Sequence, residues 1–351
     1  MNSLRSRRKN EHLLLALRGA RCSFSKAWEI SLLHDCLTTI AAEDVEIGGT
    51  LWGNRVSSPI YINAITGGTA MAAYVNDILA RTAGSFQVPL AVGSQSVALD
   101  NPRAKASFTR VRKLNPQGII LANVSASSSP KRALTAVEML DAQVLQLHLN
   151  PAQEMIMPEG DRAHPNLLEN IGEICALSPV PVMVKEVGFG IAGSQAAKLS
   201  RANISALDVS GSGGTNFAQI EGARVGSNWW LPFAEWGLPT PLCVAEAVRA
   251  HPELPIFASG GVKNGLQVAQ LMALGAWGAG VAGEALYHTF HGGQRALEQW
   301  LNQLLRQLRT TIALCGLKSP RELAQAPVMI TGKLGELFFL RGFDLVKMAN
   351  R

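Results

Sequence analysis

The chain has few of the features by which nucleic-acid-binding and membrane proteins are recognised. Aromatic residues make up only 6% of its 351 residues, with three tyrosines, and they do not interleave with basic residues as stacking on single-stranded nucleic acid would require. No apolar run approaches the roughly 18 residues that a membrane-spanning helix needs. The run Leu13 to Leu17 is also too short for a signal-peptide core. We therefore expect neither nucleic-acid nor membrane partners, and a cytoplasmic location.

Cysteine is scarce, and its spacing argues against two common kinds of cross-link. The five cysteines are odd in number, widely spaced and without a CxxC pair, which favours reduced thiols over disulfides or zinc ligands. They are Cys22, Cys36, Cys175, Cys243 and Cys315.

The overall composition is that of a well-buried globular α/β protein, with 47% hydrophobic residues and 33 glycines. Thirty-two basic against 26 acidic residues give a net charge of +6. That moderate excess suits an anionic small ligand as well as a nucleic acid, so charge alone does not choose between them.

From residue 59 onward the sequence repeats one unit: a short apolar run, a polar or glycine-rich segment, then a stretch of helical length. The runs are Ile60 to Ile65, Leu90 to Gln95, Ile119 to Ser125, Val144 to Asn150, Val180 to Val187, Ala206 to Gly211, Ile256 to Gly261 and Trp277 to Gly283. Eight strand and helix pairs predict parallel βαβ units closed into a (β/α)8 TIM barrel. A doubly wound open sheet is the alternative, but no GxGxxG follows the first run, where that fold usually carries its nucleotide motif.

Additions to the barrel are expected near both ends of the chain. Residues 1–58 are predicted to form a basic arm and a capping hairpin, and residues 59–351 the barrel with C-terminal helices. The arm contains Arg8 and Lys9 and is either a flexible tail or a clamp for an anionic ligand.

The hairpin and the C-terminal extension are predicted from local patterns. Gly48 and Gly49 favour a tight turn within Val45 to Trp52, which would plug one end of the barrel. Ala296 to Leu314 has the pattern of an amphipathic helix, which would pack on the outside of the barrel.

Residues 144–162, VLQLHLNPAQEMIMPEGDR, have an unusual polar face. Leucines alternate with Gln146, His148 and Asn150, which predicts a strand with three hydrogen-bonding side chains on one side. A loop rich in carboxylates and amides is expected to follow, including Glu154. Such oxygen ligands suit Mg²⁺, which takes one or two carboxylates together with water and phosphate oxygens. Alternatively, the charges of this loop pair with each other.

The segments after the last two predicted strands, ASGGVKNG and GVAGEAL, indicate a phosphate site, because such barrels commonly bind phosphate there. Lys185 ends an otherwise apolar strand, and its burial requires an anionic partner. That partner is either an electron-rich cofactor ring or the neighbouring strand ends.

Together these strings resemble the type 2 isopentenyl-diphosphate Δ-isomerases, the flavin-dependent class of that enzyme. The resemblance covers nearly the whole chain and is carried by RRKNEH, NAITGG, AVGSQ, NVSAS, QLHLNPAQEMIMPEGDR, VKEVGFG, DVSGSGGTNFAQIE, ASGGVKNG and TGKLGELFFLRG. HLNPAQE joined to PEGDR is highly specific for the family, whereas ASGGV and VKEVG occur in looser form in other flavin barrels.

This resemblance implies an enzyme of isoprenoid precursor synthesis that interconverts isopentenyl and dimethylallyl diphosphate with FMN and Mg²⁺. NADPH is implied as the reductant of the flavin. Because the reaction is redox-neutral, the reduced flavin is implied to act as an acid/base participant.

Site residues are implied by position. The substrate-binding residues are Arg8, Lys9, His148, Asn150 and Gln153, of which His148 and Gln153 are the catalytic candidates; Glu154 is the Mg²⁺ ligand. The residues implied to line FMN are Ala64, Ile65, Thr66, Ser94, Asn123, Lys185, Ser210 and Thr215. Those implied to hold its phosphate are Gly260, Gly261, Val262, Lys263, Ala282 and Gly283.

The chain departs from the family pattern at three places: Ile65 replaces a frequent Met, Ser96 a frequent Arg, and residues 163–164 a common acidic-aromatic pair. Two other functions are weighed beside the isomerase. One is an FMN barrel oxidoreductase acting on a hydroxy acid, and the other is a basic scaffold that keeps a relic flavin site.

Barrels of this kind often assemble, so a homo-oligomer is expected. Trp229, Trp230 and Trp236 are interpreted as an interface, a lid or core packing.

Overall fold

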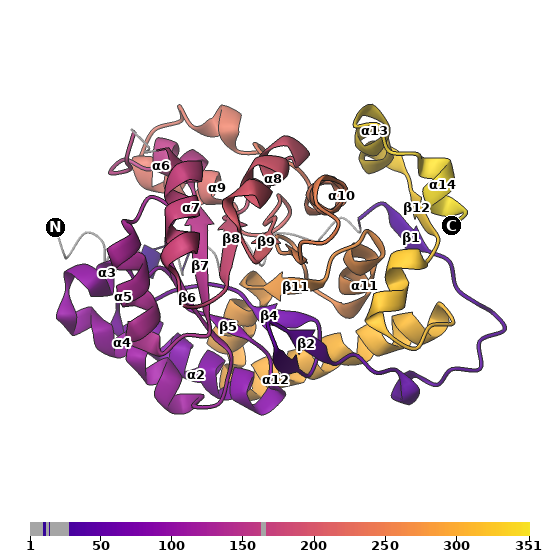
Figure 1. Ribbon diagram of the computed structural model, residues 1–351, viewed down its shortest axis with the longest axis horizontal. Helices are drawn as coiled ribbons and strands as arrows, with labels where there is room; N and C mark the ends of the chain where they lie inside the picture. The colour runs from indigo at the N-terminus through magenta and orange to yellow at the C-terminus, as the bar shows by residue number, and fades with distance from the viewer. Residues whose placement is uncertain (1–9, 12–13, 15–27, 163–165) are drawn as a thin grey trace.

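Eight parallel strands close into a barrel at the centre of the computed structural model, which describes residues 10–11, 14, 28–162 and 166–351 (Figure 1). The barrel strands are β4 (Ile60–Ile62), β5 (Leu90–Ala91), β6 (Ile120–Ser125), β7 (Val144–Leu149), β8 (Val182–Glu186), β9 (Ala206–Asp208), β10 (Ile256–Ala258) and β11 (Gly278–Val281). They neighbour one another in chain order, and β11 pairs with β4 to close the ring. Each lies within one of the eight predicted runs, so the (β/α)8 prediction is confirmed.

Helices follow every strand and cover the outside of the barrel. They are α2 (Ala70–Phe86), α3 (Ser96–Asp100), α4 (Pro102–Leu114), α5 (Pro130–Leu140), α6 (Pro151–Ile156), α7 (Leu167–Leu177), α8 (Gly193–Leu199), α9 (Phe217–Val225), α10 (Thr240–Ala250), α11 (Gly265–Ala273) and α12 (Gly283–Leu314). Local sequence sets several starts: the Thr69 and Asn101 side chains accept N–H groups of α2 and α4, and proline occupies the first turn of α4, α5 and α6.

The barrel interior is apolar toward the N-terminal ends of its strands. Phe257 is 1% exposed and lies at its centre, with its ring centroid 5.5 Å from that of Tyr61 and 5.1 Å from that of Trp277. Leu121 and Met183 belong to the same buried cluster. This layer is a packed core, as expected for the inside of an eight-stranded barrel.

A hairpin closes this apolar end, as predicted, but its turn lies elsewhere. Strands β2 (Gly49–Leu51) and β3 (Asn54–Val56) are joined by Trp52 and Gly53, whose φ angles are 48° and 76°. Two positive φ values define a type I′ turn, which favours glycine at its second position. The prediction of a turn at Gly48-Gly49 was therefore wrong. Leu51 and Val56 face the barrel, and the Trp52 ring stacks on Phe257 at 6.1 Å.

A segment before the barrel and a segment after it pair to form an extension beside the barrel. Strand β1 (Ile30–Leu32) pairs antiparallel with β12 (Val328–Ile330), and Gln270 of α11 donates a hydrogen bond to the Ile30 carbonyl at 2.7 Å. Short 3-10 helices are η1 (Ala42–Asp44), η2 (Ser200–Ala202), η3 (Leu231–Phe233) and η4 (Pro320–Gln325), and the chain ends with α13 (Gly332–Leu340) and α14 (Leu345–Ala349).

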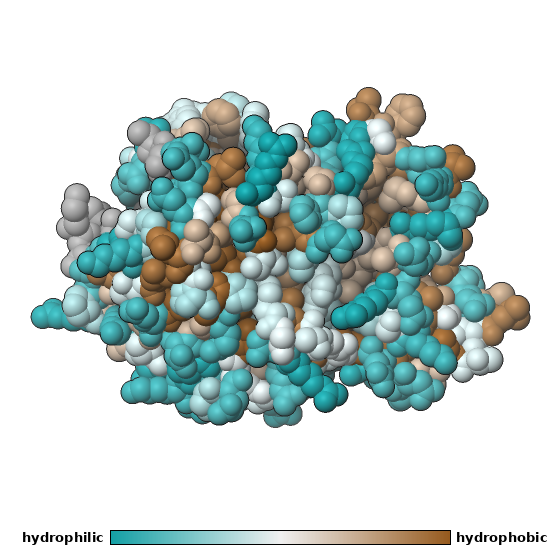
Figure 2. Space-filling view, viewed as in Figure 1, coloured by the Kyte–Doolittle hydropathy of each residue, from teal (hydrophilic) through white to brown (hydrophobic). Residues whose placement is uncertain are grey.

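The C-terminal helices confirm the predicted extension. The predicted helix from Ala296 to Leu314 forms the second part of α12, after a kink at Gly293 with φ 64°. Figure 2 shows hydrophobic residues at the upper right of the molecule, where Figure 1 places α13 and α14. Phe339, Leu340 and Val346 are exposed there. No helix in the described ranges combines the length and hydropathy that crossing a membrane would require.

Candidate active site

Four polar side chains form a hydrogen-bonded chain across the other half of the barrel interior. Asn123 donates to Gln146 at 2.6 Å, Gln146 to Asn63 at 3.4 Å, and Asn63 to Asp208 at 2.9 Å. Each of them is at most 3% exposed. Because buried amides need partners, this chain fixes which way every amide points, from β6 through to β9.

Asp208 is the acceptor at the end of that chain. It receives the backbone N–H groups of Ser210 at 3.1 Å and Ser259 at 3.0 Å, the Ser259 hydroxyl at 2.8 Å, and the Tyr61 hydroxyl. Burial first, and then the Asp208 charge, raise the pKa of Tyr61 well above its usual value. Tyr61 thus stays a donor. Sequence reasoning missed both residues, because each lies within or at the end of an otherwise apolar strand.

Lys185 points into the barrel, in register with His148 of β7 and Asp208 of β9. It is 6% exposed, and its ammonium group donates to the Glu186 carbonyl at 2.5 Å. Burial lowers its pKa, while the nearby charges of Asp208 and Glu186 oppose that shift. Within the part of the chain that the structure describes, this is its one hydrogen bond, so two of its N–H groups can serve an anionic ligand.

Glu186, the next residue, shapes the turn after β8 and was not singled out from the sequence. One carboxylate oxygen accepts the backbone N–H groups of Gly188 at 2.6 Å, Phe189 at 2.5 Å and Gly190 at 3.1 Å. Burial raises its pKa to about 7, although these hydrogen bonds and Lys185 act in the opposite direction.

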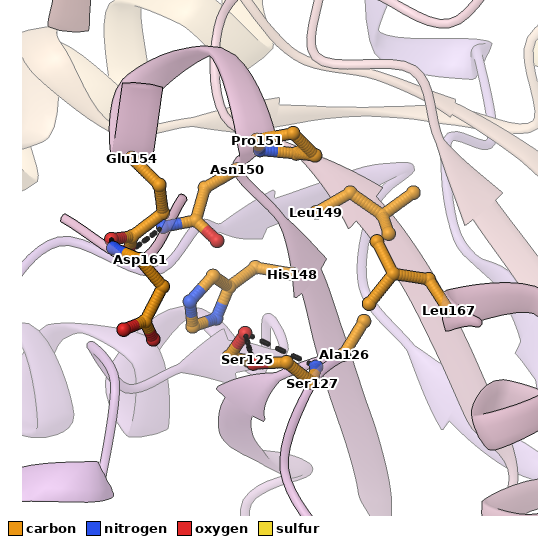
Figure 3. A pocket seen from close by; sticks show the side chains of 10 residues that line it. All are labelled: Ser125, Ala126, Ser127, His148, Leu149, Asn150, Pro151, Glu154, Asp161 and Leu167. Carbon is orange, nitrogen blue, oxygen red and sulfur yellow. Dashed lines mark hydrogen bonds between the residues drawn. The ribbon is translucent and has the colours of Figure 1, made fainter. Parts of the chain in front are cut away.

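His148, Asn150 and Glu154 gather at a small pocket at the end of β7 (Figure 3). His148 Nδ1 lies 2.9 Å from Asn123 Oδ1. That contact makes Nδ1 the donor, because the Asn123 amide nitrogen is already bonded to Gln146. Ser125 and Asp161 line the same pocket.

The residues after Asn150 are a helix, α6, and the prediction of a loop was wrong. Pro151 occupies its first position, where the missing N–H costs nothing. The helix separates two neighbouring side chains: Glu154 accepts from Asn150 at 2.8 Å, whereas Gln153 points to Glu221 of α9.

The Glu154 carboxylate is held on both oxygens, since the Asp161 N–H donates to the second at 3.0 Å. In the described ranges no group of three or more His, Cys, Asp and Glu side chains could enclose a metal ion. One carboxylate beside an open pocket nevertheless fits Mg²⁺, which completes its shell with water and substrate phosphate oxygens.

Gln153 is 8% exposed, and its amide nitrogen donates to Glu221 at 2.8 Å. Glu221 is fully buried and pairs with Arg224 of the same helix. Glu221 and Arg224 were not predicted as site residues from the sequence, although Glu221 ends the string DVSGSGGTNFAQIE.

The loops after β9, β10 and β11 meet in a glycine cradle. Gly260 and Gly261 have φ angles of 98° and 88°. A Cβ atom at Gly214 would lie 2.6 Å from the Gly261 nitrogen, so only glycine allows these backbones to approach. Ala282 provides no side-chain cap for α12, which leaves N–H groups at that helix start for an anion. The geometry fits the phosphate of FMN.

The remaining FMN candidates lie at strand ends around the same mouth. Thr66 is 4% exposed, and its hydroxyl has no hydrogen-bond partner among the residues described, which suits a residue that faces a bound group. Ser94 contacts the Ser96 hydroxyl at 3.2 Å, and the Ala64 N–H donates to Asn63 at 2.7 Å. Arg8 and Lys9 lie outside the described residues.

Comparison with known proteins agrees with this geometry. The FMN-dependent dehydrogenase family matches residues 99–330. An isopentenyl-diphosphate delta-isomerase of Symbiobacterium thermophilum is 41% identical over 99% of both chains, and one of Bacillus pumilus is 38% identical over 97% of this chain and 96% of that one.

Solved structures agree in fold. A mandelate oxidase variant with an FMN adduct superposes with a TM-score of 0.63 at 16% identity, over 92% of both chains. The chain therefore belongs to the FMN-dependent dehydrogenase family and, within it, to the type 2 isopentenyl-diphosphate delta-isomerases.

Proposed function

We propose that this protein is an FMN-dependent isomerase that interconverts isopentenyl and dimethylallyl diphosphate. The observation that carries the proposal is the pairing of two features at one barrel mouth, the glycine cradle and the cluster of His148, Asn150 and Glu154. The relatives named isopentenyl-diphosphate delta-isomerase, which match nearly the whole chain, support it.

FMN would be held by its phosphate in the cradle of Gly260, Gly261 and Gly283, with its ring near Thr66 and Lys185. When bound and reduced, FMN supplies the acid/base group that exchanges protons with the alkene. Lys185 would place positive charge beside the ring, and its lowered pKa follows from burial. The hydrogen bond between Asn123 and Gln146 would hold both amides in fixed orientations for contact with the bound cofactor.

The diphosphate would bind with Mg²⁺ at the rim of the mouth. Glu154 is the proposed metal ligand, and its fixed carboxylate is consistent with a single protein ligand to a hydrated ion. Arg8, Lys9, His148 and Asn150 are the proposed diphosphate contacts. This remote binding energy would hold a weakly binding alkene in place for proton transfer.

Gln153 is the proposed residue beside the reacting carbons. Its amide nitrogen is engaged by Glu221, so its oxygen is the end left to orient a proton or an ordered water. His148 is also held at one end of its side chain, because Nδ1 is bonded to Asn123. Nε2 is then the ring nitrogen proposed to face the substrate. Apolar neighbours such as Ile156 and Phe189 would keep water from a cation-like state.

We further propose NADPH as the reductant of FMN, a cytoplasmic location and a homo-oligomeric assembly. Exposed apolar side chains support assembly, namely Phe339 and Leu340 on α13 and Trp229 and Trp236 before α10. Trp230, by contrast, packs beside Ile156.

The deciding experiment is an anaerobic incubation of the purified protein with FMN, NADPH, Mg²⁺ and isopentenyl diphosphate. We expect dimethylallyl diphosphate far in excess of the NADPH consumed. No product despite bound, reduced flavin would contradict the proposal.

A hydroxy-acid oxidoreductase is the second candidate, because the solved structures of similar fold include mandelate oxidase. It predicts one equivalent of flavin reduced for each hydroxy acid oxidised, without NADPH. Mixing the oxidised holoprotein with mandelate or lactate and following flavin bleaching separates the two activities.

A further inference from the structure

One guanidinium group, that of Arg224, connects three acidic side chains that are far apart in the sequence. Its Nε lies 3.0 Å from a carboxylate oxygen of Glu11, and its two terminal nitrogens lie 2.8 Å from Glu159 and 2.5 Å from Glu221. The Arg224 side chain is only 14% exposed. All three nitrogen positions of the guanidinium are therefore used, a geometry that lysine cannot reproduce.

The three carboxylates belong to separate parts of the proposed site. Glu11 lies in the N-terminal segment, directly after the residues proposed to grip the diphosphate. Glu159 lies in the turn after α6, which also carries the Asp161 N–H that holds Glu154. Glu221 lies on α9 and is fully buried.

Glu221 links Arg224 to Gln153, because it is bonded to both side chains. One of its oxygens pairs with Arg224 and the other accepts the Gln153 amide at 2.8 Å. A carboxylate is planar, so fixing one oxygen fixes the direction of the other. Without Arg224, the buried Glu221 carboxylate would lose this ion pair, and the loss favours protonation or rearrangement.

The N-terminal segment has a second contact beside the first. Thr69 donates a hydrogen bond to the Asn10 side chain at 2.9 Å, at the start of α2. Glu11 lies two residues after Lys9 in the sequence. Neutralising Glu11 with Arg224 would also prevent that carboxylate from competing with a diphosphate for the basic residues.

We propose that Arg224 is a positioning residue that couples the anchoring of the N-terminal arm to the orientation of Gln153. This inference rests on the proposed isomerase function. In this proposal, both diphosphate binding by the N-terminal arm and the orientation of the Gln153 amide depend on Arg224, which contacts neither the diphosphate nor Gln153.

The coupling is tested with Glu11→Gln, Glu221→Gln and Arg224→Met. Glu11→Gln should raise KM for isopentenyl diphosphate about tenfold with kcat within about twofold, because it weakens the ion pair that anchors the arm to Arg224. Glu221→Gln should lower kcat about tenfold or more with a smaller change in KM, since it disturbs Gln153. Arg224→Met should show both defects.

The decisive measurement is a double-mutant cycle. In the Arg224→Met background, Glu11→Gln should change KM less than it does in the parent, because the contact between these two side chains is already gone. Unchanged, additive effects of Glu11→Gln in both backgrounds would overturn the coupling. Arg110→Met is the matched control, since Arg110 pairs with Asp77 on the outer surface, and it should leave both constants unchanged.

Two readouts independent of turnover separate this proposal from a purely structural role and from failure of the proposed function. Trypsin should cleave after Lys9 several-fold faster in Glu11→Gln and Arg224→Met than in the parent, with FMN content and thermal midpoint retained. If the parent shows no isomerase activity, the proposed function fails, but this cleavage difference still tests the anchor. Equal cleavage rates, or kinetic losses that only follow lost FMN, would refute the positioning role.

Discussion

The two ends of the barrel are built with opposite chemistry from the same eight strands. At the N-terminal end, Phe257, Tyr61, Trp277 and the hairpin residue Trp52 form an aromatic cluster. At the C-terminal end, the inward positions are amides, carboxylates and a lysine that satisfy one another through hydrogen bonds. The apolar end stabilises the barrel by excluding water. At the polar end, buried groups hydrogen-bond to one another and are held in fixed orientations around the site.

Tyr61 joins the two layers. Its ring packs against Phe257 at the apolar end, while its hydroxyl donates to Asp208 at the polar end. The comparison predicts that substitutions at the first end change stability with little effect on chemistry, and that substitutions at the second do the reverse.

Phe257→Ala should have the largest effect and act on folding. Removing this ring from the buried cluster should lower the free energy of unfolding by about 3–5 kcal/mol, measured by urea unfolding. Turnover per bound FMN should stay within about twofold. Leu177→Ala, at an exposed position at the end of α7, is the control and should be nearly neutral. A large loss of turnover in folded, FMN-loaded Phe257→Ala would break the division between the two ends.

Glu154→Gln should act on chemistry and leave folding alone. A neutral amide binds a hard dication poorly, so we expect activity to fall on the order of 100-fold and its dependence on added Mg²⁺ to weaken. The thermal midpoint should be unchanged. Glu138→Gln, exposed on α5, is the control. An unaltered rate with an unaltered metal requirement would remove Glu154 from the mechanism.

Glu186 should make the polar end sensitive to pH. Its pKa is raised from 4.5 to about 7 by burial, so the folded protein binds this proton more tightly than the unfolded chain. The free energy of unfolding contributed by Glu186 should therefore fall as pH rises from 4.5 to 7, by on the order of 1–2 kcal/mol.

Chemical denaturation of Glu186→Gln across that pH range tests this contribution. The variant should become more stable relative to the parent as pH rises, because it has no proton to lose. Glu173→Gln, at an exposed site on α7, should run parallel to the parent. A parallel profile for Glu186→Gln as well would contradict the raised pKa.

Gly53→Ala should have the smallest effect on stability, and it tests the turn of the hairpin at the apolar end. Gly53 has φ 76° and nothing near its absent side chain, so only backbone strain, about 1 kcal/mol, opposes alanine there. Gly49→Ala is the matched control in the same hairpin, with open space and no positive φ. A loss of thermal stability at Gly49 equal to that at Gly53 would contradict the assigned turn.

Local sequence patterns determined most of the architecture. The alternation in residues 144–149 predicted a strand with Gln146 and His148 on one face, and both lie on the polar side of β7. Glycine-rich segments after the last two strands predicted the cradle, because close backbone approach permits few other residues. A parallel barrel places the C-terminal ends of all its strands at one mouth, so polar residues at separate predicted strand ends could be assigned to one site.

Tertiary structure alone decided the partners. In the sequence Asp208 looks like an ordinary strand end, and only the folded barrel places the donors Tyr61, Asn63 and Ser259 beside it. The helix α6 turns Gln153 away from Glu154, which a sequence read as a loop does not reveal. Arg224 pairs with carboxylates up to 213 positions away. Periodicity and glycine placement depend on neighbours along the chain, whereas charge pairing and pKa depend on neighbours in space, and only folding brings those together.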